Sequence, residues 1–215
     1  MRFIDLPKDG NATPHLVQAL TNAIEKGEAG ICLPTGEYHF WPEGGERRFL
    51  HISNNDDADN DIAVLLENLD GFTIRGNKTR LIFHGRVTPF VFRHSKNINL
   101  IGVRIDWERP FHCEGNVLAV SPTGNWIEFE IPKGFSYRTE GGQFYFVGEG
   151  FEQKGIKNIL EFDKKTRESR YNVTDNFFKW RTGEYRQKYN ATDIGPRRVR
   201  LEVDGKFRTV PKVGN

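Results

Sequence analysis

The 215-residue sequence is short of sulfur and of long apolar runs. It has two cysteines, Cys32 and Cys113, and a single methionine. The cysteines lie far apart in the sequence, which argues against a disulfide framework and a thiolate metal site. The longest apolar runs, such as Ile62–Leu66, fall far short of the roughly 20 residues that cross a bilayer. We therefore expect two buried thiols and no association with a membrane.

The chain also lacks an excess of charge of one sign, because 31 basic residues are balanced by 29 acidic ones. Such a mixed surface does not attract polyanions, so nucleic acid is not expected as a partner. Residues 1–10 lack the features of a signal peptide. Metal-binding His-x-x-x-His and Cys-x-x-Cys patterns are absent, as are the Gly-x-Ser-x-Gly elbow and a phosphate-binding loop. Nothing in the sequence indicates the oligomeric state.

One helix is predicted near the N-terminus. Thr13 can cap it, Pro14 suits its first turn, and apolar residues recur at helical spacing from Leu16 to Ile24, before Gly27 ends it. Two short strands are expected in residues 30–40, on either side of a turn.

An internal repeat follows in residues 62–105. When the sequence is moved along itself so that Val64 lies over Phe90, five more residues match. Leu65, Leu66, Phe72, Ile74 and Gly76 then lie over Val91, Phe92, Ile98, Leu100 and Gly102, respectively. We call this shift the repeat offset. A repeat of roughly 20–50 residues built only of strands is typical of a solenoid. We therefore expect an all-β fold, a right-handed parallel β-helix with an N-terminal capping helix, whose first coils occupy residues 1–114. A β-sandwich with accidentally similar strands is the alternative. Asn68 and Asn97 are expected to adopt left-handed backbone in the turns.

Residues 115–210 are predicted to form an antiparallel β insertion. Hairpins are expected for residues 117–131, 156–173 and 199–210, and the last contains Asp204-Gly205, a strong hairpin signal. Residues 211–215 are interpreted as the start of a return to the β-helix. Since no capping element is seen there, we expect the remaining coils to be missing or supplied elsewhere.

The sharpest candidate for chemistry is the segment IDWERPF at residues 105–111. Glycosidases use two carboxyl groups and often bind sugar on aromatic faces, so Asp106, Trp107, Glu108 and Arg109 are of suitable types. Adjacent strand residues point to opposite faces, however, so Asp106 and Trp107 share a cleft only if the strand has ended. The structural alternative is that Asp106 or Glu108 pairs with Arg109 while Trp107 packs under the insertion.

Two polar segments are weaker candidates. Residues 51–57, HISNNDD, could bind a cation or a sugar hydroxyl, but they lack EF-hand spacing and are typical of a solvated turn. His84-Gly85-Arg86 could reach a substrate, although a histidine at a strand end is more often part of a structural hydrogen bond.

Several stretches taken together resemble glycoside hydrolase family 110. They are LPTGEYHF at 33–40, ISNNDD at 52–57, LIFHGR at 81–86, IDWERPFH at 105–112, LEFDKKTR at 160–167 and IGPRRV at 194–199. The resemblance covers nearly the whole chain and is specific in combination. It implies a right-handed β-helix and an exo-acting, inverting α-1,3-galactosidase that removes terminal α-linked galactose from glycans, without a metal or organic cofactor.

The resemblance also implies where the site lies. The family's catalytic carboxylates are expected on later coils, in sequence beyond Asn215, so no residue of this chain is assigned a catalytic role. The substrate-binding candidates are Asp106, Trp107, Glu108, Arg109 and His112. A secreted or periplasmic location follows from the resemblance. The alternatives are a non-catalytic glycan-binding β-helix and a pectinase-like polysaccharide lyase, in which Arg80, Arg86 and Arg104 would converge with calcium-binding carboxylates on one sheet.

Overall fold

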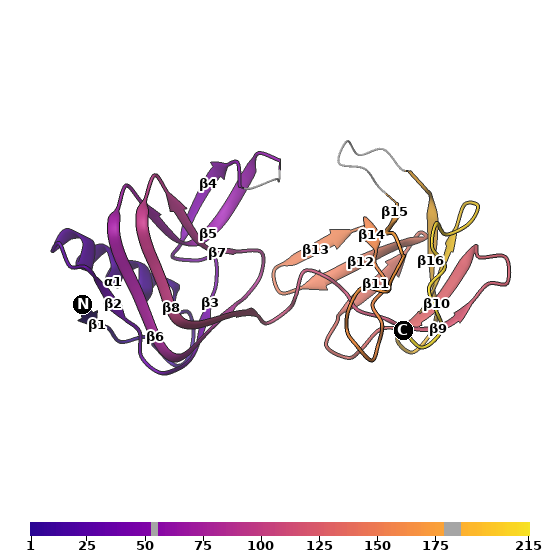
Figure 1. Ribbon diagram of the computed structural model, residues 1–215, viewed down its shortest axis with the longest axis horizontal. Helices are drawn as coiled ribbons and strands as arrows, with labels where there is room; N and C mark the ends of the chain where they lie inside the picture. The colour runs from indigo at the N-terminus through magenta and orange to yellow at the C-terminus, as the bar shows by residue number, and fades with distance from the viewer. Residues whose placement is uncertain (53–55, 179–185) are drawn as a thin grey trace. The chain divides into compact units, whose positions relative to one another are not determined.

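The computed structural model describes residues 1–52, 56–178 and 186–215. The chain divides into two compact units, Met1–Arg109 and Pro110–Asn215, called unit 1 and unit 2 below (Figure 1). The described residues contain one helix, α1 (Thr13–Glu25), and are otherwise built from strands and turns, which confirms the all-β class. This helix is too short and too polar to cross a membrane.

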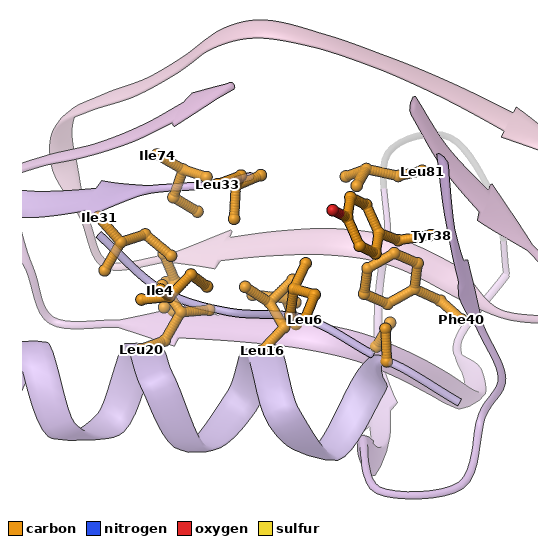
Figure 2. Packing of buried hydrophobic residues seen from close by; sticks show 14 of the residues in the cluster. Ile4, Leu6, Leu16, Leu20, Ile31, Leu33, Tyr38, Phe40, Ile74 and Leu81 are labelled. Atoms are coloured by element: carbon orange, nitrogen blue, oxygen red, sulfur yellow. The ribbon is translucent and has the colours of Figure 1, made fainter. Parts of the chain in front are cut away.

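Helix α1 covers the apolar interior of unit 1. Leu16 and Leu20 point from it toward buried residues of the strands above, among them Ile31 and Ile74 (Figure 2). The predicted cap was wrong: the N-cap residue is Ala12, and Thr13 is the first residue of the helix. The side-chain oxygen of Asn11 accepts the Thr13 N–H at 2.9 Å. Thr13 is buried and donates its hydroxyl to the Trp41 carbonyl at 2.7 Å, which ties the helix to the strand that ends beside it.

The larger sheet of unit 1 is parallel and centred on β6. It consists of β1 (Arg2–Phe3), β2 (Gly30–Cys32), β3 (Gly36–Phe40), β6 (Asp70–Phe83) and β8 (Lys96–Trp107). Strands β2 and β3 pair one after the other along one edge of β6, and β8 pairs along the opposite edge. The parallel pairing of this sheet differs from the antiparallel pairing of a typical β-sandwich.

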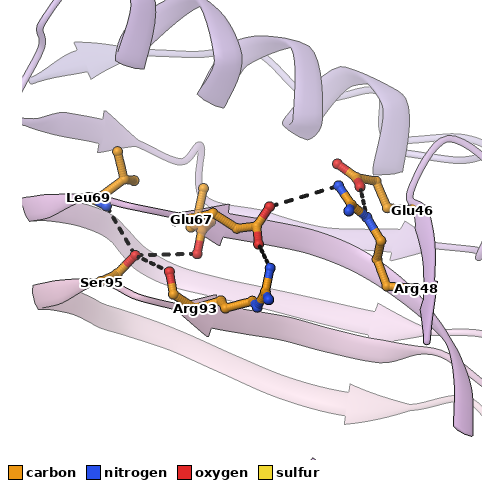
Figure 3. Close-up of polar contacts among 7 residues, drawn as sticks. Glu46, Arg48, Glu67, Leu69, Arg93 and Ser95 are labelled. Carbon is orange, nitrogen blue, oxygen red and sulfur yellow. Dashed lines mark hydrogen bonds and ion pairs between the residues drawn. The ribbon is translucent and has the colours of Figure 1, made fainter. Parts of the chain in front are cut away.

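The smaller sheet of unit 1 consists of β4 (Glu46–Leu50), β5 (Ala58–Glu67) and β7 (Thr88–Arg93). Strands β5 and β7 are parallel, whereas β4 is antiparallel to β5. Glu67 binds Arg93 at 2.8 Å and approaches Arg48 at 3.8 Å, and Arg48 also binds Glu46 at 2.8 Å (Figure 3). The hydrogen bond from Arg93 is the main cause of the lowered pKa of Glu67.

The predicted repeat sets the pairing in both sheets. Val64 pairs with Phe90 and Phe72 with Ile98, both at the repeat offset. Turns carry the chain from the smaller sheet to the larger one, and Asn68 and Asn97 have positive φ angles of 57° and 52°, as predicted. Hydrogen bonds do not merge the two sheets. The described strands therefore form separate sheets rather than the continuous solenoid that the repeat led us to expect.

The strands of unit 2 are paired antiparallel. Its sheets run in the orders β16-β17-β10-β9, β11-β12-β13 and β14-β15. The strands are β9 (Asn116–Val120), β10 (Trp126–Glu130), β11 (Tyr137–Glu140), β12 (Gln143–Gly148), β13 (Phe151–Lys154), β14 (Asn158–Ile159), β15 (Asn176–Phe177), β16 (Tyr189–Gly195) and β17 (Arg198–Val203). They enclose a second core that includes the fully buried Phe144 and Phe178.

One of the three predicted hairpins of unit 2 was correct and one was wrong. Strands β9 and β10 form the first, within residues 117–131. In the second, the only pairing among the described residues is the bridge between Phe162 and Ser169. The third, through Asp204-Gly205, does not form, because β17 already pairs with β10 on one edge and with β16 on the other. No edge of β17 is left for residues 207–210.

Candidate functional site

The outer face of the β3-β6-β8 sheet carries a cluster of polar and aromatic side chains. Side chains alternate along a strand, so the burial of Tyr38 and Phe40 places Glu37 and His39 on the outer face. The register sets Glu37 beside Arg80 and His39 beside Ile82. On its other side, Ile82 pairs with Asp106. We call Glu37, His39, Trp41, Arg80, His84 and Asp106 the outer-face cluster.

Arg80 holds the two carboxylates of this cluster. Its guanidinium lies 2.9 Å from Glu37 and 3.2 Å from Asp106, and all three side chains are about half exposed. The hydrogen bond from Arg80, followed by that from the Trp107 backbone N–H, lowers the pKa of Asp106. A carboxyl group with a lowered pKa stays ionised, so Asp106 is suited to accept hydrogen bonds and unsuited to donate a proton as a general acid.

Two imidazoles and an indole adjoin this ion-pair network. His39 Nδ1 lies 2.8 Å from His84 Nε2, and His39 Nε2 lies 3.5 Å from a carboxylate oxygen of Glu37. The Trp41 ring stacks on His84 with centroids 3.9 Å apart and an angle of 12° between the planes. A hydrogen bond between two ring nitrogens needs one donor and one acceptor, so at least one of these imidazoles is neutral while the bond exists.

The structure separates most of the predicted site residues. Asp106 lies on the outer face and pairs with Arg80 rather than with Arg109. Trp107 is still part of β8, so its side chain turns to the opposite face and packs in the core against Phe83, with ring centroids 6.0 Å apart. The expected constraint of strand alternation therefore applies: Asp106 and Trp107 do not share a face.

The other three candidates lie beyond the end of β8. Glu108 is exposed and donates its backbone N–H to the Phe83 carbonyl at 3.0 Å. Arg109 is buried and is the last residue of unit 1. His112 belongs to unit 2, where its ring nitrogen lies 3.4 Å from Glu114. The five candidates do not form one contiguous group within unit 1.

The two weaker candidate segments have different outcomes. In residues 51–57, positions 53–55 lie outside the described residues, and the flanking His51 and Asp57 contact each other at 2.9 Å with both side chains exposed. His84 takes part in the hydrogen bond and the ring stack of the outer-face cluster, as expected for a histidine at a strand end. Arg104 is the register partner of Arg80, so two of the three arginines considered for a lyase share the outer face.

Three members of the outer-face cluster, Glu37, His39 and Trp41, were not predicted as site residues, and Arg80 was considered only for the lyase alternative. A signal for the first three was available. In the segment GEYHFW, Tyr38 and Phe40 alternate with Glu37, His39 and Trp41. Successive side chains of a strand point to opposite faces, so if the first two are buried the other three lie on the outer face. Arg80 carries no comparable local signal, because its partners come from other strands.

Unit 2 has a counterpart among known families. Residues 113–215 match the family model of GLAA-B beta-barrel domain I. Unit 2 is therefore similar to a β-barrel domain of that type.

The whole chain is similar to named enzymes. It is 40% identical over 210 residues to alpha-1,3-galactosidase A of Shewanella woodyi, a match covering 97% of this chain and 33% of the relative. It is 33% identical over 193 residues to alpha-1,3-galactosidase B of Bacteroides thetaiotaomicron, covering 89% of this chain and 30% of the relative. The chain thus spans about a third of the length of these relatives and matches their N-terminal portion. The chain is therefore similar to the N-terminal portion of alpha-1,3-galactosidases of glycoside hydrolase family 110, which confirms the resemblance seen in the sequence.

Proposed function

We propose that this chain is the N-terminal part of an exo-acting α-1,3-galactosidase that removes terminal α-linked galactose from glycans with inversion. The observation that carries the proposal is the 40% identity with the Shewanella woodyi enzyme across 97% of the chain. The inverting mechanism rests on the family resemblance alone. It requires two carboxyl groups about 6.5–9.5 Å apart with room for a water molecule between them and the sugar.

We place the catalytic carboxylates of this enzyme beyond Asn215. Glu37 and Asp106 both bind the same guanidinium, that of Arg80, and the lowered pKa of Asp106 opposes a role as proton donor. The outer-face cluster has the chemistry of a sugar-binding wall instead, because carboxylates and imidazoles accept hydrogen bonds from hydroxyls and an indole packs against a pyranose ring. Of the five predicted binding residues, Asp106 is the one that this cluster supports.

We further propose that the parallel strands are the first coils of a β-helix. The shared repeat offset in both sheets supports this reading, as does the open edge of β8, which pairs only with β6 among the described strands. Residues 211–215 would lead the chain back to the next coil. In unit 2 the Val117 N–H donates to the Asn215 carbonyl at 2.7 Å, so residue 215 lies beside β9, the first strand of the unit.

A glycan substrate of this kind is encountered outside the cytoplasm, so we propose a secreted or periplasmic enzyme. The non-catalytic glycan-binding protein remains the competing function, since a wall of carboxylates, imidazoles and an indole binds sugar without hydrolysing it. A polysaccharide lyase is less well supported, because the ion pairs of Arg80 occupy the carboxylates that calcium would need.

The test is hydrolysis of an α-1,3-linked galactosyl disaccharide and of p-nitrophenyl α-galactoside. The 215-residue chain is compared with a form extended through the coding sequence that follows Asn215. Activity in the extended form alone is the expected result. Activity in the 215-residue chain would contradict our placement of the catalytic carboxylates. No hydrolysis by either form, together with measurable sugar binding, would favour the glycan-binding protein.

The role of the outer-face cluster is tested in the active form. Asp106→Asn removes the charge with little change in shape, and we expect a higher KM for the disaccharide. His51→Ala is the control, because His51 is exposed and lies outside the cluster. A KM and a thermal stability that are both unchanged in Asp106→Asn would remove Asp106 from the site.

A further inference from the structure

Unit 2 contains a cleft of about 530 Å³ that the galactosidase proposal does not use. Its lining residues are Phe177, Arg186, Gln187, Lys188, Asp204, Lys206 and Arg208. Strands β16 and β17 are antiparallel, and Tyr189 pairs with Val203 at their shared end. The residues that enter β16 and those that leave β17 are thereby brought together, and most of the lining comes from these two segments.

The backbone around this cleft is held by hydrogen bonds from both segments. The Gln187 side-chain amide donates to the carbonyls of Asp204 and Lys206 at 3.0 and 2.8 Å. The Asp204 N–H donates to the Lys188 carbonyl at 3.0 Å. The cationic side chains therefore project from a braced backbone rather than from an unsupported loop.

The charge of the cleft is one-sided. Four cationic side chains line it, against the one carboxylate of Asp204. Two exposed arginines elsewhere in unit 2 do have acidic partners, since Arg138 binds Glu152 and Arg200 binds Glu128. Within the described part of the chain, no ion pair is found for three exposed cations of the cleft, Lys188, Lys206 and Arg208. Uncompensated cations gathered in a concave surface create a local positive potential that attracts anions.

The wall of the cleft also offers an apolar surface. The Phe177 side chain is 38% exposed, and an exposed aromatic ring is a suitable surface for the face of a pyranose. A cation cluster beside an aromatic ring suits an anionic sugar better than it suits a free small anion. The balanced charge of the whole chain argues against a general nucleic-acid surface.

We propose that this cleft binds an anionic group, a sulfate ester or a carboxylate, carried by a glycan chain. The inference rests on the proposed function for the choice of a glycan, while the site itself is distinct from the outer-face cluster. It gives the β-barrel domain a role in holding charged polysaccharides.

The first experiment measures binding of the 215-residue chain by isothermal titration calorimetry at low and at physiological salt. The probes are a sulfated galactan oligosaccharide, the same oligosaccharide after desulfation, and oligogalacturonate. Binding of the sulfated or the uronate probe, weakened by salt and absent for the desulfated probe, is expected. The two anionic probes distinguish a sulfate site from a carboxylate site. Equal binding of the sulfated and desulfated probes would overturn the proposal.

The second experiment assigns binding to the cleft. Lys188→Gln combined with Lys206→Gln should weaken binding of the anionic oligosaccharide about tenfold, because two exposed charge contacts are lost. The control is Lys133→Gln with Lys164→Gln, which removes two exposed charges of unit 2 outside the cleft. Equal losses in the two double variants would show an effect of overall charge and refute the site.

Two further outcomes keep this proposal separate from the galactosidase. Tighter binding of a DNA oligomer than of either anionic glycan, lost in the cleft variant, would overturn the choice of a glycan. Failure of all anionic glycans to bind, with hydrolysis of the neutral disaccharide intact in the extended form, would refute the cleft alone. Cleft-dependent binding without any hydrolysis would instead count against the galactosidase.

Discussion

The close approach of β6 and β8 at their matched glycines makes a sharp prediction about stability. Gly102 has φ +67°, and a Cβ built there would lie 2.3 Å from the carbonyl oxygen of Gly76. The contact is reciprocal, because a Cβ on Gly76 would lie 2.8 Å from the carbonyl oxygen of Gly102. Two backbones meet at this point, so neither position has room for a side chain.

We expect Gly102→Ala to destabilise unit 1 by about 2–5 kcal/mol. A left-handed conformation costs an alanine about 1–2 kcal/mol, and the displacement of the neighbouring backbone adds about 1–3 kcal/mol, typical of overpacking. Gly71→Ala is the matched control, because Gly71 has φ +81° but no atom within 4 Å of its added Cβ. The Gly71→Ala variant should lose only the stability that the left-handed conformation costs an alanine, about 1–2 kcal/mol.

The measurement is hydrogen exchange of peptides from β6 and β8, followed by mass spectrometry. Exchange reports the opening of unit 1 itself, which matters because a chain of two units need not unfold in one step. The excess destabilisation of Gly102→Ala over Gly71→Ala isolates the steric clash. Equal losses in the two variants would refute the close approach of the strands.

Three other substitutions test further contacts. Phe83→Ala removes a fully buried ring and should cost unit 1 about 3–5 kcal/mol in urea unfolding; a loss below about 1 kcal/mol would contradict its place in the core. Arg80→Gln should raise the lowered pKa of Asp106 toward its ordinary value in an NMR titration. The stabilisation of this ion pair is present above the ordinary aspartate pKa and is lost as the pH falls through the lowered one, so an unchanged titration midpoint would contradict the pairing. Glu161→Ala removes the acceptor of hydrogen bonds from the Lys212 N–H and from Asn215, which should cost about 1–3 kcal/mol of local stability. Amide hydrogen exchange at the C-terminus should therefore become faster. Glu168 is exposed, so Glu168→Ala should leave this exchange unchanged.

The repeat was readable from the sequence because parallel strands place the same inward positions above one another. Phe72 and Ile98 are both apolar since both face the core, and the repeat offset follows from such matches. The register then shifts, however. Beyond the bulge, Thr79 pairs with Val103 and Leu81 with Ile105, so the paired residues lie closer together in the sequence than the repeat offset predicts. Three residues of β6 lie opposite Gly102 alone, and no local pattern in the sequence marks such an irregularity.

Unit 2 was predictable only where its pairing is local. The turn between Val120 and Trp126 is short, and the hairpin it closes was found in the sequence. The pairing of β10 with β17 joins segments far apart in the chain, and single-sequence patterns carry no information on it. Because of this long-range pairing, no hairpin forms at Asp204-Gly205, although this dipeptide is a strong hairpin signal. After the turn, the Phe207 N–H donates to the Gly124 carbonyl at 2.8 Å, so the chain crosses to the β9–β10 turn instead of folding back.

The candidate site shows how a repeat could be used to find contacts between strands. The search for chemistry followed contiguous motifs and grouped Asp106 with its neighbours in sequence, Trp107 and Glu108, whereas its ion-pair partner is Arg80, one repeat offset earlier. The same separation joins Glu67 with Arg93. Glu67 and Arg93 are direct register partners, whereas Arg80 lies opposite Arg104 and reaches Asp106 diagonally across the paired parallel strands. A search for opposite charges at the offset of the apolar repeat would still have found both ion pairs. In such a fold the polar face is therefore predictable from the repeat length, once the buried face has fixed that length.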